Sequence, residues 1–234
     1  MSGTLKILAF DVFGTVVDWH GSIADEVRRL SLPVDPNEFA TAWRAGYKPA
    51  MAKVRSGSLP WTKIDDLHRM ILNEILQRFN IVSLSESQIH ELNRIWHRLK
   101  PWQDTVKGLQ ILKNQFTIVT LSNGNLSLLA NMAKNAGLPW DLILSAEVFR
   151  HYKPDPETYL GVAEIFDVLP EQVMLVAAHK DDLMAANACG LKTAFIERPL
   201  EFGPHFSRND LHREEYINYH AKDLLDLAAQ LHCG

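Results

Sequence analysis

The stretch KILAFDVFGT, residues 6–15, determines how the rest of this chain is interpreted. A short apolar run at Ile7–Phe10 leads into Asp11 and then into a turn that contains Gly14. Continuous apolar runs of this length are typical of strands buried on both faces of a parallel sheet. Position 13, two residues after the carboxylate, is Phe, so no second acid stands there to bind a metal or to donate a proton. We therefore predict a strand that ends in a nucleophile working alone, Asp11.

Four more apolar runs of the same kind occur downstream, and helical patterns separate them. The runs are Phe116–Leu121, Leu142–Ser145, Val173–Ala177 and Thr193–Ile196. The helical patterns are Val106–Asn114, Leu126–Ala136, Pro156–Phe166 and Asp182–Ala188, with a last helix expected at Ala221–Leu231. Alternating strands and helices predict an α/β fold with a doubly wound, Rossmann-like parallel sheet.

Residues 19–100 interrupt this alternation, because they contain no convincing strand. Their helical stretches are Ile23–Leu30, Pro36–Val54, Trp61–Phe79 and Ser85–Leu99. They could be extra helices on a single core or an inserted cap. We favour a cap, because the insertion follows the Asp11 turn and ligands bind at the carboxyl ends of parallel strands. The expected division is a core of residues 1–18 and 101–234 and a helical cap of residues 19–100.

Composition limits the class of protein. The charge balance of 24 basic and 28 acidic residues gives a net charge of −4, which does not favour binding to nucleic acid or a membrane surface. Cys189 and Cys233 have no metal-ligand spacing, which favours a reducing compartment. Neither a signal peptide nor an apolar stretch of membrane-spanning length is visible, so we expect a cytoplasmic protein without membrane partners.

Polar groups follow the predicted strand ends one after another. They are Asp11, Ser122-Asn123-Gly124, Lys153-Pro154 and Asp181-Asp182. Each alone has an ordinary explanation as a turn residue, a helix cap or a solvated lysine. The carboxyl ends of neighbouring parallel strands converge on one crevice, however, so the four together predict a catalytic site.

These ordered motifs resemble the haloacid dehalogenase superfamily over about residues 5–198. Asp11-Val12-Phe13-Gly14-Thr15 resembles the first motif of that superfamily, Leu121-Ser122-Asn123 the second, and Lys153-Pro154 the third. The strand before Asp182 resembles the fourth. Within the superfamily, Asp-x-Phe-Gly-Thr and Ser-Asn-Gly are similar to the L-2-haloacid dehalogenases (type II) rather than to the phosphatases.

The chain departs from the phosphatase pattern at two positions. Phosphatases of the superfamily carry an acid two residues after the nucleophile, where Phe13 can neither donate nor accept a proton. Ala178 stands where they supply a metal-binding acid, although Asp181 and Asp182 keep a magnesium site open as an alternative. We expect no metal and no cofactor.

The resemblance implies hydrolysis of short 2-haloalkanoic acids, such as haloacetates and L-2-halopropionate, to 2-hydroxy acids. Asp11 would displace the halide and form an ester, which water then hydrolyses. Lys153 is the expected charge partner that lowers the pKa of Asp11. The alternatives are a magnesium-dependent phosphatase or phosphonate hydrolase and a non-catalytic protein that binds small acids.

The resemblance also assigns roles to further residues. Halide binding falls to Arg44 from the cap and to Asn123, and binding of the substrate carboxylate falls to Ser122. Thr15 would hold Asp11 in place, and Val12 and Phe13 would contact the substrate. Tyr159 would lie near the nucleophile. Asp182 would orient Lys153 or activate the hydrolytic water. His179 replaces an asparagine of the commonest dehalogenase motif, and we expect it to titrate near neutral pH. Trp43, Trp61 and Trp96 suggest an apolar surface for a homodimer, and the preferred halogen remains open.

Overall fold

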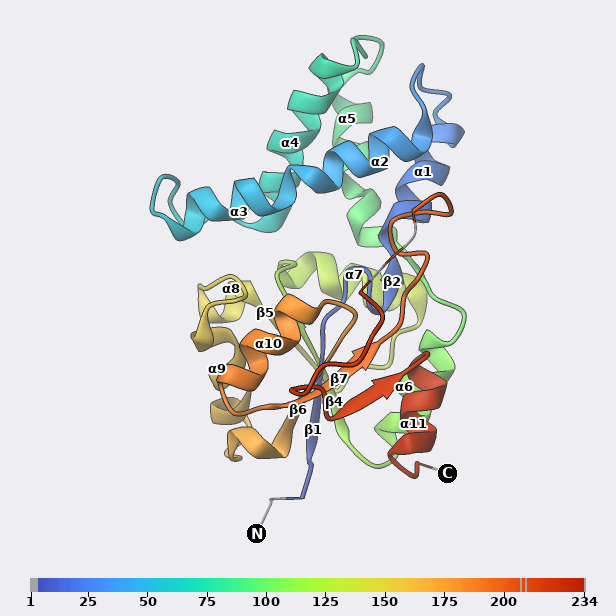
Figure 1. Ribbon diagram of the computed structural model, residues 1–234. Coiled ribbons are helices and arrows are strands. Elements are labelled where there is room, and N and C mark those ends of the chain that lie inside the picture. The colour runs from blue at the N-terminus through green and yellow to red at the C-terminus, as the bar shows by residue number, and fades with distance from the viewer. Residues whose placement is uncertain (1–3, 207, 209, 234) are drawn as a thin grey trace.

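The structure, a computed structural model, describes residues 4–206, 208 and 210–233 (Figure 1). Its centre is a six-stranded sheet in the order β5-β4-β1-β6-β7-β8, in which every neighbouring pair is parallel. The strands are β1 (Ile7–Phe10), β4 (Thr117–Ser122), β5 (Leu142–Ser145), β6 (Val173–Ala177), β7 (Lys192–Ile196) and β8 (Tyr219–Ala221). The predicted parallel sheet is confirmed, and all five predicted runs agree with strands to within one residue at each end.

Helices cover both faces of this sheet, as the continuous apolar strands require. Leu8 and Phe10 of β1 belong to one apolar core, and Ile7 and Ala9 belong to a second core on the opposite face. The first core includes side chains of α6 (Thr105–Lys113), α7 (Leu126–Ala136) and α11 (Leu224–Gln230). The second includes side chains of α9 (Pro156–Ile165) and α10 (Lys180–Ala188). The short helices α8 (Ala146–Phe149) and η2 (Pro170–Gln172) complete this part of the chain.

The strand order reverses at β1, which lies between β4 and β6. Crevices at such switch points, outside the carboxyl ends of the strands, are where doubly wound sheets bind ligands. Asp11 is the first residue after β1, and its backbone N–H donates to the carbonyl oxygen of Val176 in β6 at 3.0 Å. The fold therefore places this carboxylate at the switch point.

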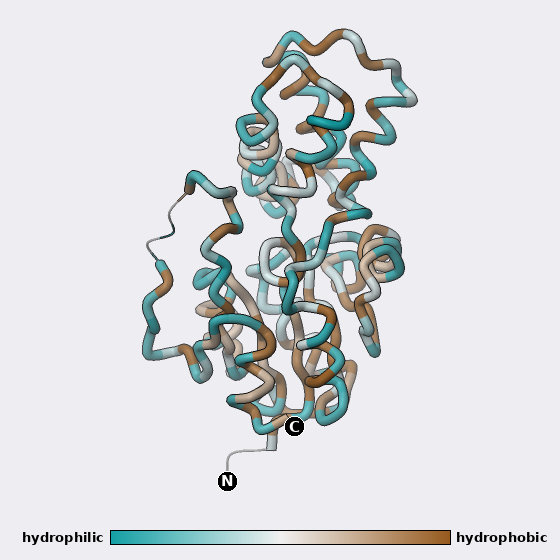
Figure 2. The backbone as a smooth tube through the Cα atoms, turned by 90° about the vertical axis from the view of Figure 1, so that its right-hand side faces the viewer, coloured by the Kyte–Doolittle hydropathy of each residue, from teal (hydrophilic) through white to brown (hydrophobic). Residues whose placement is uncertain are grey.

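Residues 19–98 form a helical block above the carboxyl ends of the strands. The block contains α1 (Trp19–Arg29), α2 (Pro36–Ala45), α3 (Tyr47–Arg55), α4 (Ile64–Arg78), α5 (Glu86–Asn93) and η1 (Arg94–Arg98). It is entered through β2 (Val17–Asp18) and left through β3 (Lys100–Pro101), which pair antiparallel with each other. Figures 1 and 2 show the block as a layer of its own next to the part that holds the sheet.

Several local expectations need correction. The predicted stretch Pro36–Val54 is divided at Gly46, where a Cβ would lie 2.5 Å from Cγ2 of Ile71. The last helix begins at Leu224 instead of Ala221, because Ala221 belongs to β8. Strands β2, β3 and β8 are only two or three residues long and carry no apolar run that could have indicated them.

Two of the three tryptophans expected at a dimer surface lie inside the helical block. Trp43 and Trp96 are completely buried and pack edge to face, with their ring centroids 5.5 Å apart. Trp61 is half-buried, with its ring centroid 4.9 Å from that of Tyr152. The expected apolar surface is therefore wrong for Trp43 and Trp96, and the homodimer stays a prediction. Among the described helices, none combines the length and the apolar character needed to cross a membrane.

Candidate active site

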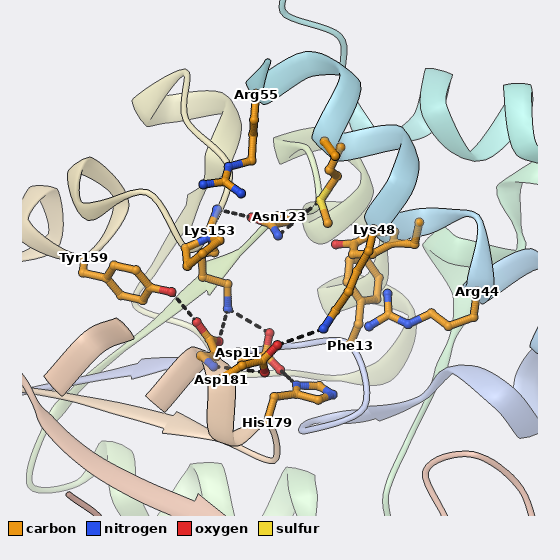
Figure 3. Close-up of a pocket in the computed structure, with 15 residues that line it drawn as sticks. Asp11, Phe13, Arg44, Lys48, Arg55, Asn123, Lys153, Tyr159, His179 and Asp181 are labelled. Carbon is orange, nitrogen blue, oxygen red and sulfur yellow. Dashed lines mark hydrogen bonds and ion pairs between the residues drawn. The ribbon is translucent and has the colours of Figure 1, made fainter. Parts of the chain in front are cut away.

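A pocket of about 360 Å³ lies between the strand ends and helices α2 and α3 (Figure 3). The sheet-bearing part of the chain contributes Asp11, Phe13, Asn123, Lys153, Pro154, Tyr159, His179, Asp181 and Asp182 to its lining. The helical block contributes Arg44, Tyr47, Lys48, Met51, Ala52 and Arg55. Polar groups predicted from four strand ends thus do converge on one site.

Both oxygens of the Asp11 carboxylate are held by hydrogen-bond donors. Lys153 Nζ lies 3.0 Å from Oδ1, and the Thr15 hydroxyl donates to Oδ2 at 2.7 Å. His179 Nδ1 donates to Oδ2 as well, at 3.0 Å. Burial by itself would raise the pKa of Asp11, but the two cations and the hydrogen bonds outweigh it and hold the pKa well below its usual range. Asp11 is therefore an ionised carboxylate at neutral pH.

Lys153 lies between two buried carboxylates. Its Nζ contacts Asp182 Oδ2 at 2.5 Å in addition to Asp11, and the Tyr159 hydroxyl donates to Asp182 Oδ1 at 2.6 Å. The backbone N–H of Lys153 donates to Asn123 Oδ1 at 2.8 Å, which ties this loop to the end of β4. Burial opposes the charge on Lys153, yet the two carboxylates raise its pKa above the usual value. The expected contact between Asp182 and Lys153 is present.

His179 faces a carboxylate with each ring nitrogen. Nδ1 donates to Asp11, and Nε2 lies 2.8 Å from Oε1 of Glu201. Because an ionised carboxylate only accepts hydrogen bonds, both nitrogens carry protons and the ring is an imidazolium. Burial would lower the pKa of His179, but Glu201 and Asp11 together raise it to about 10. The expectation that His179 titrates near neutral pH is therefore wrong for the free protein.

Arg44, in the last turn of α2, directs its guanidinium group toward the pocket (Figure 3). The guanidinium carbon lies 4.2 Å from the ring centroid of Tyr47 and 5.6 Å from that of Trp19. Its Nη1 is buried and has no hydrogen-bond partner within the described part of the chain. Asn123 Nδ2 donates to a weak acceptor, Met51 Sδ at 3.4 Å. These two groups can donate hydrogen bonds to an anion.

Of three candidate residues from the first two motifs, one lines the pocket and two are buried outside its lining. Phe13 lines the pocket, and its ring packs edge-on against Trp96 with centroids 5.7 Å apart. Ser122 and Val12 are buried and do not belong to the pocket lining. The Ser122 hydroxyl accepts from the backbone N–H of Gly124 at 3.1 Å and so stabilises the turn after β4.

Sequence reasoning missed the contribution of α3. Tyr47, Met51 and Arg55 recur every four residues and therefore share one helix face, a spacing that could have indicated a pocket wall. Lys48 pairs with Asp181 at 2.8 Å, and Arg55 pairs with Asp155 at 2.6 Å. These two ion pairs connect α3 to the sheet-bearing part of the chain. Glu201 was also missed, because a single acid in a loop carries no local signal.

The charged groups of the site do not resemble a metal centre. Among the described residues, no group of three or more His, Cys, Asp and Glu side chains is arranged to hold a metal ion. The space between the carboxylates of Asp11 and Asp182 contains the ammonium of Lys153. A divalent cation needs several oxygen ligands around it, which the ammonium at this position opposes.

A buried aspartate at the switch point of a parallel sheet, with lysine and aspartate supplied by later strand ends, is the architecture of the haloacid dehalogenase superfamily. Comparison with known proteins gives the family. The chain belongs to the haloacid dehalogenase-like hydrolases, whose family model matches residues 5–190. Glu201 lies beyond the matched residues.

Individual relatives point to one branch of this family. The (S)-2-haloacid dehalogenase 1 of Pseudomonas sp. (strain CBS-3) is 26% identical over 205 residues, which cover 83% of this chain and 85% of that protein. The crystal structure of the L-2-haloacid dehalogenase PA0810 is 48% identical, with a TM-score of 0.92, and covers 98% of this chain and 100% of its own. That of the defluorinating L-2-haloacid dehalogenase Rha0230 is 46% identical, with a TM-score of 0.92 and coverage of 97% and 95%. The resemblance to L-2-haloacid dehalogenases is confirmed.

Proposed function

We propose that this protein hydrolyses short 2-haloalkanoic acids, such as haloacetates and L-2-halopropionate, to 2-hydroxy acids. The reaction proceeds through an ester on Asp11 and needs no metal ion. The observation that carries the proposal is the pairing of an ionised Asp11, held between Lys153 and His179, with Phe13 at the position of a general acid. The names of the relatives support the same substrate class.

In the first step, Asp11 displaces the halide. Among the described residues, Oδ1 has one hydrogen-bond donor and Oδ2 has two, so a lone pair of Oδ1 remains available for attack. The new bond joins Oδ1 to the halogen-bearing carbon, and the carbon–halogen bond breaks with its electron pair on the halide. A halide leaves without a proton, so Phe13 is compatible with this chemistry. Arg44 and Asn123 stabilise the departing anion.

In the second step, water attacks Cγ of the Asp11 ester. Asp182, fixed by Lys153 and Tyr159, is the candidate that orients Lys153 or activates this water. The bond between Cγ and Oδ1 then breaks, and Oδ1 leaves with the product as its hydroxyl oxygen. One proton of the water goes to that hydroxyl and the other to solvent, which regenerates the carboxylate.

The helical block acts as a cap in this proposal. It supplies Arg44, Lys48 and Arg55 to the pocket wall, and the positive charge of Arg44 favours an anionic substrate. Residues 19–100 then form the cap, and residues 1–18 and 101–234 form the core. Ser122 and Val12 were expected to bind the substrate, but they lie outside the pocket lining, so their role in this proposal is to shape the backbone around the pocket.

Halide release tests the proposal directly. The protein is incubated with chloroacetate, fluoroacetate and L-2-chloropropionate, with and without EDTA, and Asp11→Asn serves as the inactive control. We expect halide release that survives EDTA and is absent in the variant. Release of phosphate from phosphate esters only when Mg²⁺ is present would instead support the phosphatase alternative. No turnover of either kind would leave a protein that only binds small acids.

A single turnover in H₂¹⁸O tests the ester. Water attacks Cγ, so the label is expected in Asp11, and the first hydroxy acid is expected to carry unlabelled oxygen. Label in the hydroxy acid after one turnover would exclude the covalent route.

A homodimer and a cytoplasmic location complete the proposal. The homodimer rests on the family resemblance, and the location rests on the sequence pattern. Sedimentation velocity gives the mass of the particle, and a monomer at micromolar concentration would contradict the dimer.

A further inference from the structure

Two donors point at the same oxygen of Asp11. The Thr15 hydroxyl and His179 Nδ1 both donate to Oδ2, at 2.7 Å and 3.0 Å. The direction of the Thr15 hydroxyl is fixed, because its oxygen accepts from the backbone N–H of Ala178 at 2.8 Å. If Oδ1 attacks the substrate, Oδ2 becomes the carbonyl oxygen of the ester. The two donors then flank the oxygen on which negative charge develops when water adds to Cγ.

Glu201 holds the imidazole ring from the other side. Its Oε1 accepts from His179 Nε2 at 2.8 Å and from Trp19 Nε1 at 3.3 Å. Its Oε2 accepts from Arg208 Nη1 at 2.8 Å. Glu201 is fully buried, and a Cβ on Gly14 would lie 2.3 Å from Oε1, so this carboxylate packs directly against the Asp11 turn.

We propose that Glu201 keeps His179 protonated after Asp11 has become an ester, so that His179 and Thr15 form an oxyanion hole for hydrolysis of that ester. This inference rests on the function proposed above. His179 is then a catalytic residue, because it touches the reacting carboxyl group, and Glu201 is a positioning residue that acts through it.

Hydrolysis of the ester moves electrons through the carbonyl group of Asp11. Water adds to Cγ, and the π electrons of the carbonyl move to Oδ2, where the two donors stabilise the negative charge. When the carbonyl reforms, the bond between Cγ and Oδ1 breaks and Oδ1 leaves with the product. The product oxygen takes one proton of the water, and the second proton passes to solvent.

Glu201 is needed because Asp11 loses its charge when it forms the ester. Of the two carboxylates that contact His179 in the described part of the chain, Glu201 alone then remains an anion. Burial would raise the pKa of Glu201, but His179, Arg44 and Arg208 outweigh it and keep the pKa below its usual value. The charged groups around the imidazole are Asp11 after β1, Asp181 on α10, Glu201 in the loop after β7, and Arg44 and Arg208, which face Glu201.

The pH dependence of ester hydrolysis distinguishes this role from two others. An imidazolium donor is lost as the pH rises, so hydrolysis slows on the alkaline side. A neutral imidazole that took a proton from water would instead make hydrolysis faster as the pH rises. A purely structural role of Glu201 would change the rate by the same factor at every pH.

The experiment compares wild type with Glu201→Gln in single turnovers of L-2-chloropropionate between pH 6 and pH 10. Rapid quench and intact-protein mass spectrometry follow formation and loss of the ester separately. We expect hydrolysis in wild type to keep its rate to a higher pH than in Glu201→Gln, because Glu201 still accepts from His179 Nε2 when Asp11 is an ester. In Glu201→Gln, hydrolysis should fall about tenfold between pH 6 and pH 9, because a neutral donor is weaker than a charged one. A uniform loss at every pH, no loss, or a rate that rises with pH overturns the proposal.

Glu197→Gln is the matched control. Glu197 lies four residues earlier in the same region and also binds a histidine, His220, at 2.7 Å, without contact to Asp11. This variant should show the wild-type pH profile.

A second measurement needs no variant. In wild type at pH 8, ¹⁵N NMR of the His179 ring should show both nitrogens protonated, and an unprotonated nitrogen overturns the proposal. If wild type releases no halide from any of the acids, the proposed function itself fails. If halide is released and Glu201→Gln matches wild type, only the present inference fails.

Discussion

Lys153 Nζ lies 3.0 Å from Oδ1 of Asp11, although the two residues are 142 positions apart in the chain. Both side chains are almost fully buried, with 7% and 10% of their surface exposed, so water screens their interaction little. Because the folded-state pKa of Asp11 is depressed, its stabilising contribution is present above the unfolded pKa of about 3.9. That contribution is lost as the pH falls toward the folded value. The catalytic charge and part of the stability therefore depend on the same contact.

Replacing Lys153 by Met should lower activity and stability together. Asp11 and Asp182 would remain as two buried carboxylates without their shared cation, a change that costs about 3–5 kcal/mol in free energy of unfolding. The pKa of Asp11 should rise, so the acid limb of kcat/KM should move to higher pH. Urea unfolding and a pH profile measure the two effects. Lys113→Met, which removes an exposed pair with Asp141, should cost less than about 1 kcal/mol. An unchanged acid limb in Lys153→Met would contradict the assigned charge partner.

Replacing Arg44 by Met should slow the first step. Its buried Nη1 is the donor proposed to meet the departing halide, and loss of one such donor typically costs about 10²-fold in kcat. Inhibition by added bromide should weaken in the same variant, because the halide loses its guanidinium partner. Arg69→Met, which removes a pair with Glu86 inside the helical block, provides the control. If Arg44→Met kept the wild-type kcat, the halide would have to leave toward a different group.

The strands and the convergence of the site were predictable, because each depends on a pattern that is local in sequence. Continuous apolar runs marked β1, β4 and β6, and the polar residues that follow parallel strands must meet at one edge. Strand β8 was not predictable from the sequence. Its three residues, Tyr-His-Ala, form no apolar run, and they adopt strand geometry by pairing with β7.

Glu201 is a site residue that local sequence patterns could not predict either. Nothing near it in sequence distinguishes it from a solvated loop acid, and its role arises from contacts with residues 22 and 182 positions away. The protonation state of His179 follows from Glu201, so the expectation of a neutral-pH titration for that histidine was wrong for the same reason. Local patterns located the nucleophile, whereas tertiary packing determines the charges around it.

Shortening Phe13 to Ala should destabilise the protein. The ring is 2% exposed and packs edge-on against Trp96 and Tyr47, so its loss leaves a cavity between the Asp11 turn and the helical block. We expect a loss of about 3–5 kcal/mol in free energy of unfolding, measured with urea. Phe206→Ala removes a side chain that is 53% exposed and should change stability far less. Equal effects of the two substitutions would mean that the Phe13 contacts contribute little.

The ion pair between Arg55 and Asp155 should affect substrate binding through the position of α3. The pair joins α3 to the start of α9, and an exposed pair of this kind contributes about 0.2–1 kcal/mol. Arg55→Met, Asp155→Asn and the double variant should therefore raise KM by similar factors, about twofold to fivefold, with kcat unchanged. Arg55 also lines the pocket, so it could instead attract the substrate directly by its charge. In that case Arg55→Met alone would raise KM, while Asp155→Asn would leave it unchanged or lower it, because the guanidinium would be freed. Steady-state kinetics of the three variants at low ionic strength, where screening is weakest, separates a contact that positions the helix from one that recruits the anion.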